Sequence, residues 1–250
     1  MSWDPSKMKP RYILAALGGL AMAGSAAADI LVVRSSGPSA KTYPAGKSIP
    51  EGSKITLQAS DSLVVLDGRG TRTLRGPGSF AAGAPSKGVS APSAIAGMVA
   101  GAPQRRSRVG AVRSVSTTPR SPTLWHVDVA KSSTICLADP NSVTLWRADA
   151  TQPVVLSIAG PDGRVDQVSW AENEATLIWP SSMAITEGGE YRVSRGSDTS
   201  PTLLTFKWLR ARPAGIEDMA QSLILNGCQA QLDLLINTLK LPDDEAAVPG

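Results

Sequence analysis

The sequence is poor in the side chains that most enzymes use. Its 250 residues contain one histidine, His126, and two cysteines. A hydrolytic triad needs a base, most often histidine, and one His with two Cys leaves no ligand cluster of the kind that holds zinc. His126 alternates with Trp125 and Val127, which places it on the polar side of a strand, where we expect an exposed histidine. We therefore predict no catalytic residue, no metal and no cofactor.

Two further motifs match active sites only in part. Ala45-Gly46-Lys47-Ser48 matches the end of a phosphate-binding loop, but Lys41 stands where that motif needs its first glycine. Glu172 and Glu174 are a carboxylate pair of the kind that glycoside hydrolysis uses. They lie in a polar turn between Ala171 and Ala175, which is typical of a solvated loop. Neither motif changes the prediction that the protein is not an enzyme.

Only one long stretch of the chain is apolar, and it lies near the N-terminus. Residues 12–28 carry no charge, and three basic residues within the first eleven precede them. A basic start, an apolar run and small residues at its end are the features of a secretory signal peptide. We predict cleavage near Ala28 and Asp29, after residues 1–28, and a mature protein in the periplasm. The alternative is an uncleaved membrane anchor, although the run is shorter than the roughly 20 residues that a span needs.

The two cysteines predict one disulfide bond. Exported proteins meet an oxidising compartment in which disulfides persist, and Cys136 and Cys228 are an even pair. Their bond would close a loop of 92 positions (228 minus 136). For a loop of that length, the chain-entropy account gives a stabilisation of about 4 to 5 kcal/mol at best. The alternative is two buried free thiols, because free cysteine is often a core residue.

Two segments have the pattern of β-structure. Residues 29–80 contain short apolar runs separated by turn residues, and Asp67-Gly68 between two of these runs predicts a hairpin. Residues 123–210 contain seven or eight strand-length runs at the short spacing that is typical of an antiparallel β-sandwich. We therefore predict a mainly β protein with a small N-terminal β-module and a larger sandwich.

The apolar spacing becomes helical in residues 211–241. Asn226-Gly227 either separates two helices or weakens a single long one. In both cases Cys228 begins an apolar helix face. If that face points at the sandwich, it brings Cys228 to Cys136, which favours the disulfide. We expect residues 242–250 to form a flexible tail.

Residues 81–122 are rich in Gly, Ala, Ser and Pro, with six basic residues and no acidic one. Such a segment cannot bury enough apolar surface to fold alone, so we predict a basic linker. Arginine suits phosphate and carboxylate groups, which cell-wall polymers, lipids and acidic proteins present. The alternatives are a solvated linker and arginines that pair with acids of the second domain. The predicted partner-binding residues are Arg105, Arg106, Arg108 and Arg113.

The tryptophans that follow residue 28 all lie in the second domain. Aromatic side chains on a β-surface stack on sugars, which is one interpretation of them. Each lies within or beside an apolar strand, so we favour packing in the core. These residues are Trp125, Trp146, Trp170, Trp179 and Trp208.

Residues 44–79 resemble the FecR-type periplasmic domain. That family has a glycine before a short strand, a second glycine that opens the next strand, a serine-centred turn, and an apolar strand that ends in Asp-Gly. The matching positions are Gly46, Gly52, Ser60, Asp61, Leu63, Val65, Asp67 and Gly68. The resemblance implies a small β-module of bacterial envelope proteins, used in signalling or assembly and without known catalysis.

The resemblance does not extend to the anti-sigma activity of the best-known members. Such regulators carry a cytoplasmic domain before their membrane span, whereas about eleven residues precede the apolar run here. A segment of that length is too short to fold or to hold a sigma factor. We therefore do not expect that activity.

Together these features predict a non-enzymatic periplasmic module for interaction or signalling, whose partner is an envelope or inner-membrane protein. The alternative is a protein that binds the cell wall, peptidoglycan or another anionic polysaccharide, using the Arg-rich segment or an exposed tryptophan. Without residues 1–28 the chain has 22 basic (25 minus 3) and 20 acidic (21 minus 1) residues. A balance so close to neutral predicts no nucleic-acid partner.

Overall fold

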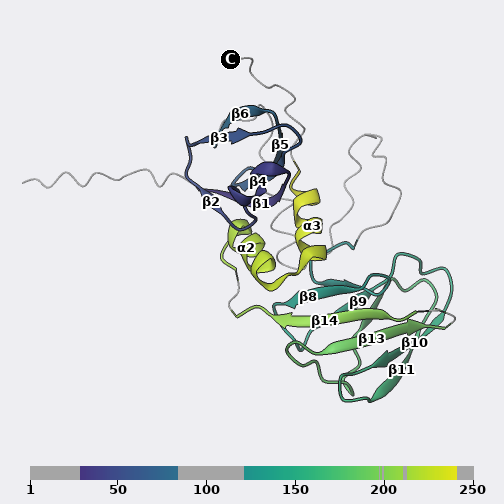
Figure 1. Cartoon of the computed structure of the whole chain (residues 1–250). Coiled ribbons are helices and arrows are strands. Elements are labelled where there is room, and N and C mark those ends of the chain that lie inside the picture. The colour runs from purple at the N-terminus through teal and green to yellow at the C-terminus, as the bar shows by residue number, and fades with distance from the viewer. Residues whose placement is uncertain (1–28, 84–120, 197, 199, 211–212, 241–250) are drawn as a thin grey trace, which may run out of the picture.

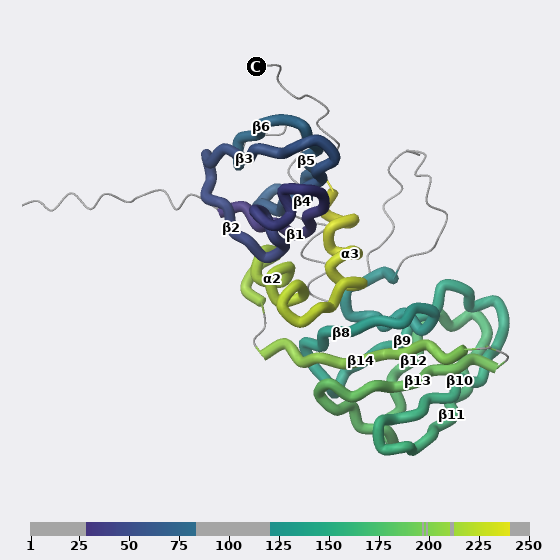
Figure 2. The backbone as a smooth tube through the Cα atoms, in the orientation of Figure 1, coloured from purple at the N-terminus to yellow at the C-terminus, as the bar shows by residue number. Residues whose placement is uncertain are grey.

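The structure is a computed structural model and describes residues 29–83, 121–196, 198, 200–210 and 213–240. The predicted signal peptide, the arginines of the predicted linker and the predicted tail lie outside these residues. The described chain is mainly β, with two C-terminal helices, as the sequence predicts. It forms an N-terminal β-module and a β-sandwich, and both helices lie between the two (Figures 1 and 2).

The N-terminal module contains a four-stranded sheet and a separate two-stranded one. Its elements are β1 (Ile30–Ser36), η1 (Pro38–Lys41), β2 (Ser48–Ile49), β3 (Lys54–Leu57), β4 (Ser62–Asp67), β5 (Gly70–Arg75) and β6 (Gly78–Ala81). The larger sheet has the order β2-β1-β4-β5, and β3 pairs with β6. Asp67 lies opposite Gly70 in the antiparallel β4–β5 pair, so the hairpin predicted at Asp67-Gly68 is confirmed.

The first four residues of β1, 30–33, are buried on both faces of the strand, which explains their uninterrupted apolar sequence. Ile30 and Val32 pack into the interior of the N-terminal module. Leu31 and Val33 point the other way and belong to the apolar cluster of the helices. Because successive side chains of a strand alternate between its faces, β1 contributes side chains both to the core of the N-terminal module and to the cluster around the helices.

Asp61 holds the turns of the N-terminal module together. Its carboxylate accepts hydrogen bonds from the backbone N–H groups of Ser39 (2.9 Å) and Gln58 (2.5 Å). Burial raises the pKa of Asp61, but hydrogen bonds from Ser39 and Gln58 outweigh burial and bring that pKa below its ordinary value. Gly37 has φ +96°, and a Cβ there would lie 2.5 Å from Asp61 Oδ1, so only glycine fits this turn.

The β-sandwich has a five-stranded and a three-stranded sheet. Its strands are β7 (His126–Asp128), β8 (Ser133–Leu137), β9 (Thr144–Trp146), β10 (Val154–Ala159), β11 (Val165–Trp170), β12 (Thr176–Ile178), β13 (Glu190–Arg195) and β14 (Thr202–Trp208). The sheet orders are β11-β10-β13-β14-β8 and β12-β9-β7.

Most neighbouring strands of the sandwich are antiparallel, but two pairs are parallel: β14 with β8, and β7 with β9. The chain passes from one sheet to the other between β7 and β8, and returns between β8 and β9. Two reversals of direction leave β7 and β9 running the same way. The wholly antiparallel expectation therefore missed these two pairs.

Two of the five tryptophans, Trp170 and Trp179, belong to the hydrophobic core of the sandwich, as we favoured, and Trp146 is buried outside that cluster. Trp146, Trp170 and Trp179 are buried. The Trp179 ring lies edge-on to Tyr191 and Phe206, with ring centroids 5.2 and 5.3 Å apart. The remaining two differ: Trp125 is partly buried against the helical cluster, and Trp208 is 41% exposed.

The helices are two separate elements, α2 (Ile216–Asn226) and α3 (Gln229–Thr238). Gly227 has φ +71° and ends α2 in the left-handed conformation that glycine adopts easily. Its N–H donates to Ile224 O, and the N–H of Cys228 donates to Leu223 O. Neither described helix is long and apolar enough to cross a membrane.

A disulfide joins the sandwich to the helices. Cys136 of β8 and Cys228, which directly precedes α3, are bonded with their Cα atoms 5.8 Å apart. Both residues are fully buried. The structure thus contains the pairing that the sequence led us to expect.

Helix α3 also contacts the N-terminal module. The backbone N–H of Thr71 in β5 donates to Leu239 O, and its hydroxyl donates to Ile236 O, both at 2.9 Å. Arg34 of β1 forms an ion pair with Asp233. The apolar cluster around the helices draws on both β-modules. Its buried members are Leu31, Val33, Leu66, Leu124, Cys136, Met219, Ala220, Leu223, Cys228, Leu232, Leu235, Ile236 and Leu239.

Gln231 of α3 binds the free edge of β8. Its amide oxygen accepts the N–H of Cys136 (2.7 Å), and its amide nitrogen donates to the carbonyls of Cys136 (2.9 Å) and Leu124 (2.8 Å). The side chain is buried. It exchanges hydrogen bonds with Cys136 as a neighbouring strand would, and so satisfies backbone groups that water does not reach.

We predict that Gln231→Leu lowers the free energy of unfolding by about 3 to 5 kcal/mol, because each buried backbone group left without a partner costs about 1 to 3 kcal/mol. Urea denaturation followed by tryptophan fluorescence measures this loss. The matched control is Gln229→Leu, an exposed position on the same helix, which should change stability by less than about 0.5 kcal/mol. Equal effects of the two substitutions would contradict the assigned role.

Candidate functional site

A pocket of about 190 Å³ opens where α3 meets the sandwich, and we call it the junction pocket. Its sandwich side comes from β7, the start of β8 and the residues before and between these strands, and its other side comes from α3. The lining residues are Ser121, Leu124, His126, Asp128, Lys131, Ser133, Ile135, Ala230, Gln231, Asp233, Leu234 and Asn237.

Simple periodicities bring these residues together. In β7, His126 and Asp128 share the side opposite the buried Val127. In α3, Ala230, Asp233, Leu234 and Asn237 recur at helical spacing and so occupy one face. Gln231 and the disulfide hold this face against the sandwich, so the pocket exists only because α3 is docked there.

His126 is half-buried, so the prediction of an exposed strand histidine needs correction. Helix α3 contributes the other wall of the pocket that His126 lines, and the strand pattern alone does not reveal this wall. His126 Nδ1 is buried and has no hydrogen-bond partner within the described part of the chain. Burial lowers the pKa of His126, so the ring is neutral at neutral pH.

The serines that line the pocket have already used their protons. Ser121 Oγ donates to Thr123 O (2.9 Å), and Ser133 Oγ donates to Lys131 O (3.2 Å). Asn237 Nδ2 donates one N–H to Asp233 O (2.7 Å). A hydroxyl has only one proton, so each serine offers only lone pairs to a ligand.

The two aspartates of the pocket are held by local contacts. Asp128 Oδ1 accepts the N–H of Ala130 (2.9 Å), and Asp128 Oδ2 lies 3.5 Å from Lys131 Nζ. Asp233 Oδ1 accepts from Arg34 and from Gln229. These contacts fix the carboxylates and leave further acceptor capacity on them, because an ionised carboxylate has about four lone-pair positions.

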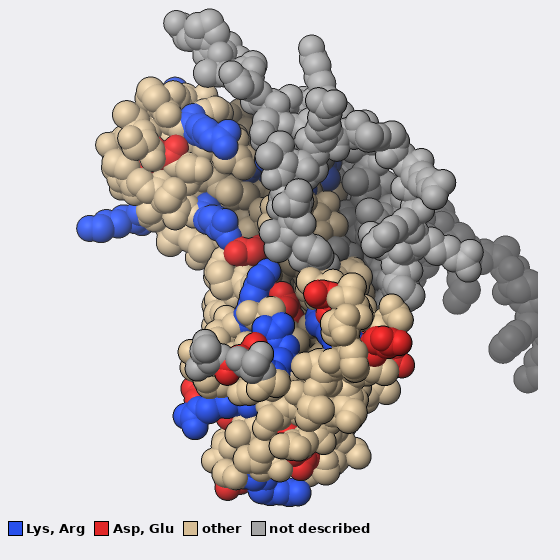
Figure 3. All heavy atoms as spheres, turned by 90° about the vertical axis from the view of Figure 1, so that its right-hand side faces the viewer, with Lys and Arg blue, Asp and Glu red and all other residues tan. Residues whose placement is uncertain are grey.

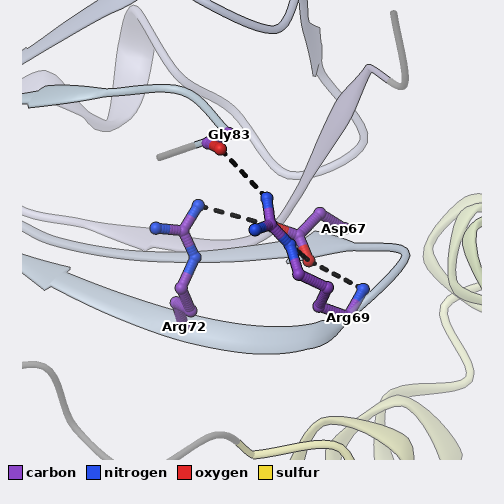
Figure 4. Close-up of polar contacts among 4 residues, drawn as sticks. All are labelled: Asp67, Arg69, Arg72 and Gly83. Atoms are coloured by element: carbon purple, nitrogen blue, oxygen red, sulfur yellow. Dashed lines mark hydrogen bonds and ion pairs between the residues drawn. The ribbon is translucent and has the colours of Figure 1, made fainter. Parts of the chain in front are cut away.

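A second polar cluster lies at the tip of the β4–β5 hairpin (Figure 4). The buried Asp67 accepts the backbone N–H of Arg69 (2.9 Å) and a guanidinium N–H of Arg72 (3.4 Å). Arg69 also donates to Gly83 O (2.9 Å), which ties the hairpin to the chain after β6. Each partner is a neighbour within the same module, so we assign this cluster to structure.

Charge is unevenly distributed over the two β-modules. Residues 29–83 contain seven basic side chains (Arg34, Lys41, Lys47, Lys54, Arg69, Arg72, Arg75) and four acidic ones (Asp29, Glu51, Asp61, Asp67). In the view of Figure 3, Lys and Arg prevail on the upper, N-terminal module, and both signs mix lower down. Acidic side chains are also present in the N-terminal module, so its excess of basic residues does not by itself indicate an anion-binding site.

The structure describes only some of the residues that the sequence analysis considered as sites. Arg105, Arg106, Arg108 and Arg113 lie outside the described residues, so their role stays a prediction. Glu172 and Glu174 are exposed in the turn between β11 and β12. Among the described residues, no group of three or more His, Cys, Asp or Glu side chains is arranged to hold a metal ion.

Sequence reasoning missed the helical half of the pocket. Asp233 and Asn237 stand four positions apart on the polar border of an apolar helix face, and this spacing was the available signal. Their position opposite Asp128 depends on how α3 docks, which no local pattern encodes.

Comparison with known proteins adds no relative. No protein-family model and no curated protein matches this chain. The FecR-type resemblance of residues 44–79 therefore stays a prediction.

We predict that the free energy of unfolding falls as the pH is lowered below about 6.5, the ordinary pKa of histidine. In that range the unfolded chain binds a proton on His126 while the folded chain, whose His126 has a lowered pKa, does not. Stability is therefore lost on acidification from pH 7.5 to pH 5, which urea titrations at both pH values measure.

His126→Asn should reduce that loss, and the assignment is specific because the chain has one histidine. Asp61, Asp149 and Asp198 also have lowered pKa values, but their contribution is lost only below their ordinary pKa of 3.8. The same fall in stability in wild type and His126→Asn would show that His126 is not the group responsible.

Proposed function

We propose that this chain is a non-enzymatic recognition module of the bacterial cell envelope, which binds a protein partner at the junction pocket. The observation that carries the proposal is the position of the pocket. One wall belongs to the sandwich, and the other belongs to the helix that also binds the N-terminal module through Thr71 and Arg34. A partner bound there contacts the element that sets the placement of both β-modules, which suits a signalling role.

The compartment is part of the same proposal. A buried disulfide that joins two parts of a small protein is typical of an oxidising environment. The basic and apolar pattern of residues 1–28 supports export. We propose the periplasm as the location, with the signal peptide removed.

The FecR-type assignment of the N-terminal module is also proposed. Positions of the FecR-like pattern coincide with backbone conformations that restrict the residue type. Gly46 and Gly52 have φ +86° and +81°, and Ser60 has φ +68°. Asp61 and Asp67 are the two buried carboxylates that organise the turns of this module. The positions of the FecR-like pattern thus include residues that the turns of this module require.

Site-specific photocrosslinking in intact cells tests the proposed function. A photoreactive amino acid replaces Lys131, whose side chain is 58% exposed at the pocket. We expect a discrete crosslinked product that contains one envelope protein, identified by mass spectrometry. The control places the same amino acid at the exposed Gln167 on β11, away from the pocket. Products of equal abundance from both positions, or none from Lys131, would overturn the proposal.

A second candidate function rests on Trp208. Its ring is 41% exposed at the end of β14, and an exposed aromatic side chain can stack on a sugar. Under this alternative, which also uses the Arg-rich segment, the chain binds peptidoglycan or another polysaccharide. Co-sedimentation with purified peptidoglycan separates the two. Retention that is lost in Trp208→Ala or in the triple variant Arg105, Arg106 and Arg108→Ala would favour polysaccharide binding.

A further inference from the structure

We propose that the junction pocket binds an arginine side chain presented by the partner polypeptide, an inference that rests on the proposed function. It names the chemistry of the group that the pocket recognises.

The pocket offers more acceptors than donors, and its strongest donor, Lys131, is largely exposed. Ser121 and Ser133 have each donated their only proton to a backbone carbonyl, so both now accept. Asp128 and Asp233 are carboxylates, which accept only, and Asn237 adds its amide oxygen. A ligand that satisfies this set must be rich in donors, and arginine has five N–H donors and no acceptor.

The acceptors lie on both walls, which suits the shape of a guanidinium group. Asp128, Ser121 and Ser133 belong to the sandwich side, and Asp233 and Asn237 belong to α3. A guanidinium group is a planar fork that donates along several of its edges at once. An ammonium group presents three donors from a single point and would reach fewer of these acceptors.

The carboxylates of the pocket are paired only with exposed cations. Two lining side chains are carboxylates and one, Lys131, is an ammonium group. Lys131 is largely exposed, and its contact with Asp128 at 3.5 Å is long for a charge-assisted hydrogen bond. His126 adds no positive charge at neutral pH, because burial lowers its pKa. Each carboxylate already has one cationic partner, Lys131 for Asp128 and Arg34 for Asp233, with side chains 58% and 49% exposed. Exposed ion pairs contribute little to stability, so an incoming guanidinium group competes with weakly held partners.

The apolar part of the lining suits the stem of the arginine. Leu124 and Ile135 are buried beneath the sandwich side, and Leu234 is partly buried on α3. The three methylene groups of arginine bury against apolar surface while the head reaches polar groups. A volume of about 190 Å³ leaves room for one long side chain.

The pocket is held in place before any ligand arrives. The disulfide and the three hydrogen bonds of Gln231 fix α3 against β8. Binding therefore does not have to order the walls, and the affinity for a single side chain is correspondingly higher.

The test titrates the purified full chain with the tripeptide acetyl-Gly-Arg-Gly-amide and follows backbone and side-chain amide signals by NMR. We expect saturable shifts at Lys131, Ser133 and Asn237. The same peptide with citrulline, a neutral analogue of arginine, and N-acetylglucosamine are the comparison ligands. Both should bind at least about fivefold more weakly, since loss of one charge-assisted contact costs about 1 kcal/mol at a partly exposed site.

Two variants probe the pocket, and one variant serves as a matched control. Asp128→Asn keeps the acceptor for Ala130 but removes the charge, and Asn237→Leu removes an acceptor on the other wall. Each should weaken arginine binding about fivefold. The control is Asp139→Asn, because Asp139 accepts a backbone N–H two residues ahead, as Asp128 does, but lies outside the pocket. It should leave binding unchanged.

The outcomes separate this inference from the proposed function. Equal binding of the arginine and citrulline peptides, or an equal effect of Asp128→Asn and Asp139→Asn, would overturn the arginine inference. Preferential binding of N-acetylglucosamine would overturn it in favour of a carbohydrate ligand. A partner captured at Lys131 together with no arginine binding would leave the proposed function standing and reject only the ligand chemistry.

Discussion

The structure depends on the docking of α3 against the edge of β8. Gln231 supplies hydrogen bonds that a neighbouring strand would otherwise provide to Cys136, and the Cys136–Cys228 disulfide holds the start of the helix at the same place. An edge strand has unpaired backbone groups, and a buried one needs partners for them. A single glutamine meets this need while the helix covers the apolar surface around it.

The two helices form an apolar cluster to which both β-modules contribute side chains. Their apolar cluster includes Leu31 and Leu66 of the N-terminal module and Leu124 beside the sandwich. Because one cluster serves both modules, a change in the docking of α3 affects their relative placement. The same helix forms a wall of the junction pocket, so recognition at the pocket is physically linked to the architecture.

The local features of the fold followed from short-range patterns. Alternation in β7, the hairpin at Asp67-Gly68 and the helical spacing after residue 211 each depend on neighbours in the chain, so the sequence predicted them. The parallel β8–β14 pair joins strands that are distant in sequence, and no periodicity specifies such a partner. His126 was expected to be exposed for the same reason, since the α3 residues that line the pocket with it lie about a hundred positions away.

The sequence by itself determined the mainly β composition, the helical C-terminal segment and the even pair of cysteines, because these follow from residue type and local spacing, whereas the structure showed that the segment is two helices. Only the tertiary structure decided which groups face one another across the junction pocket. The acceptors of β7 and α3 come from segments that are separate in the chain, and only packing sets their distance. Gln231 shows the difference most clearly: its sequence neighbours mark a helix, whereas its buried bonds to Cys136 and Leu124 arise only after the helix has docked.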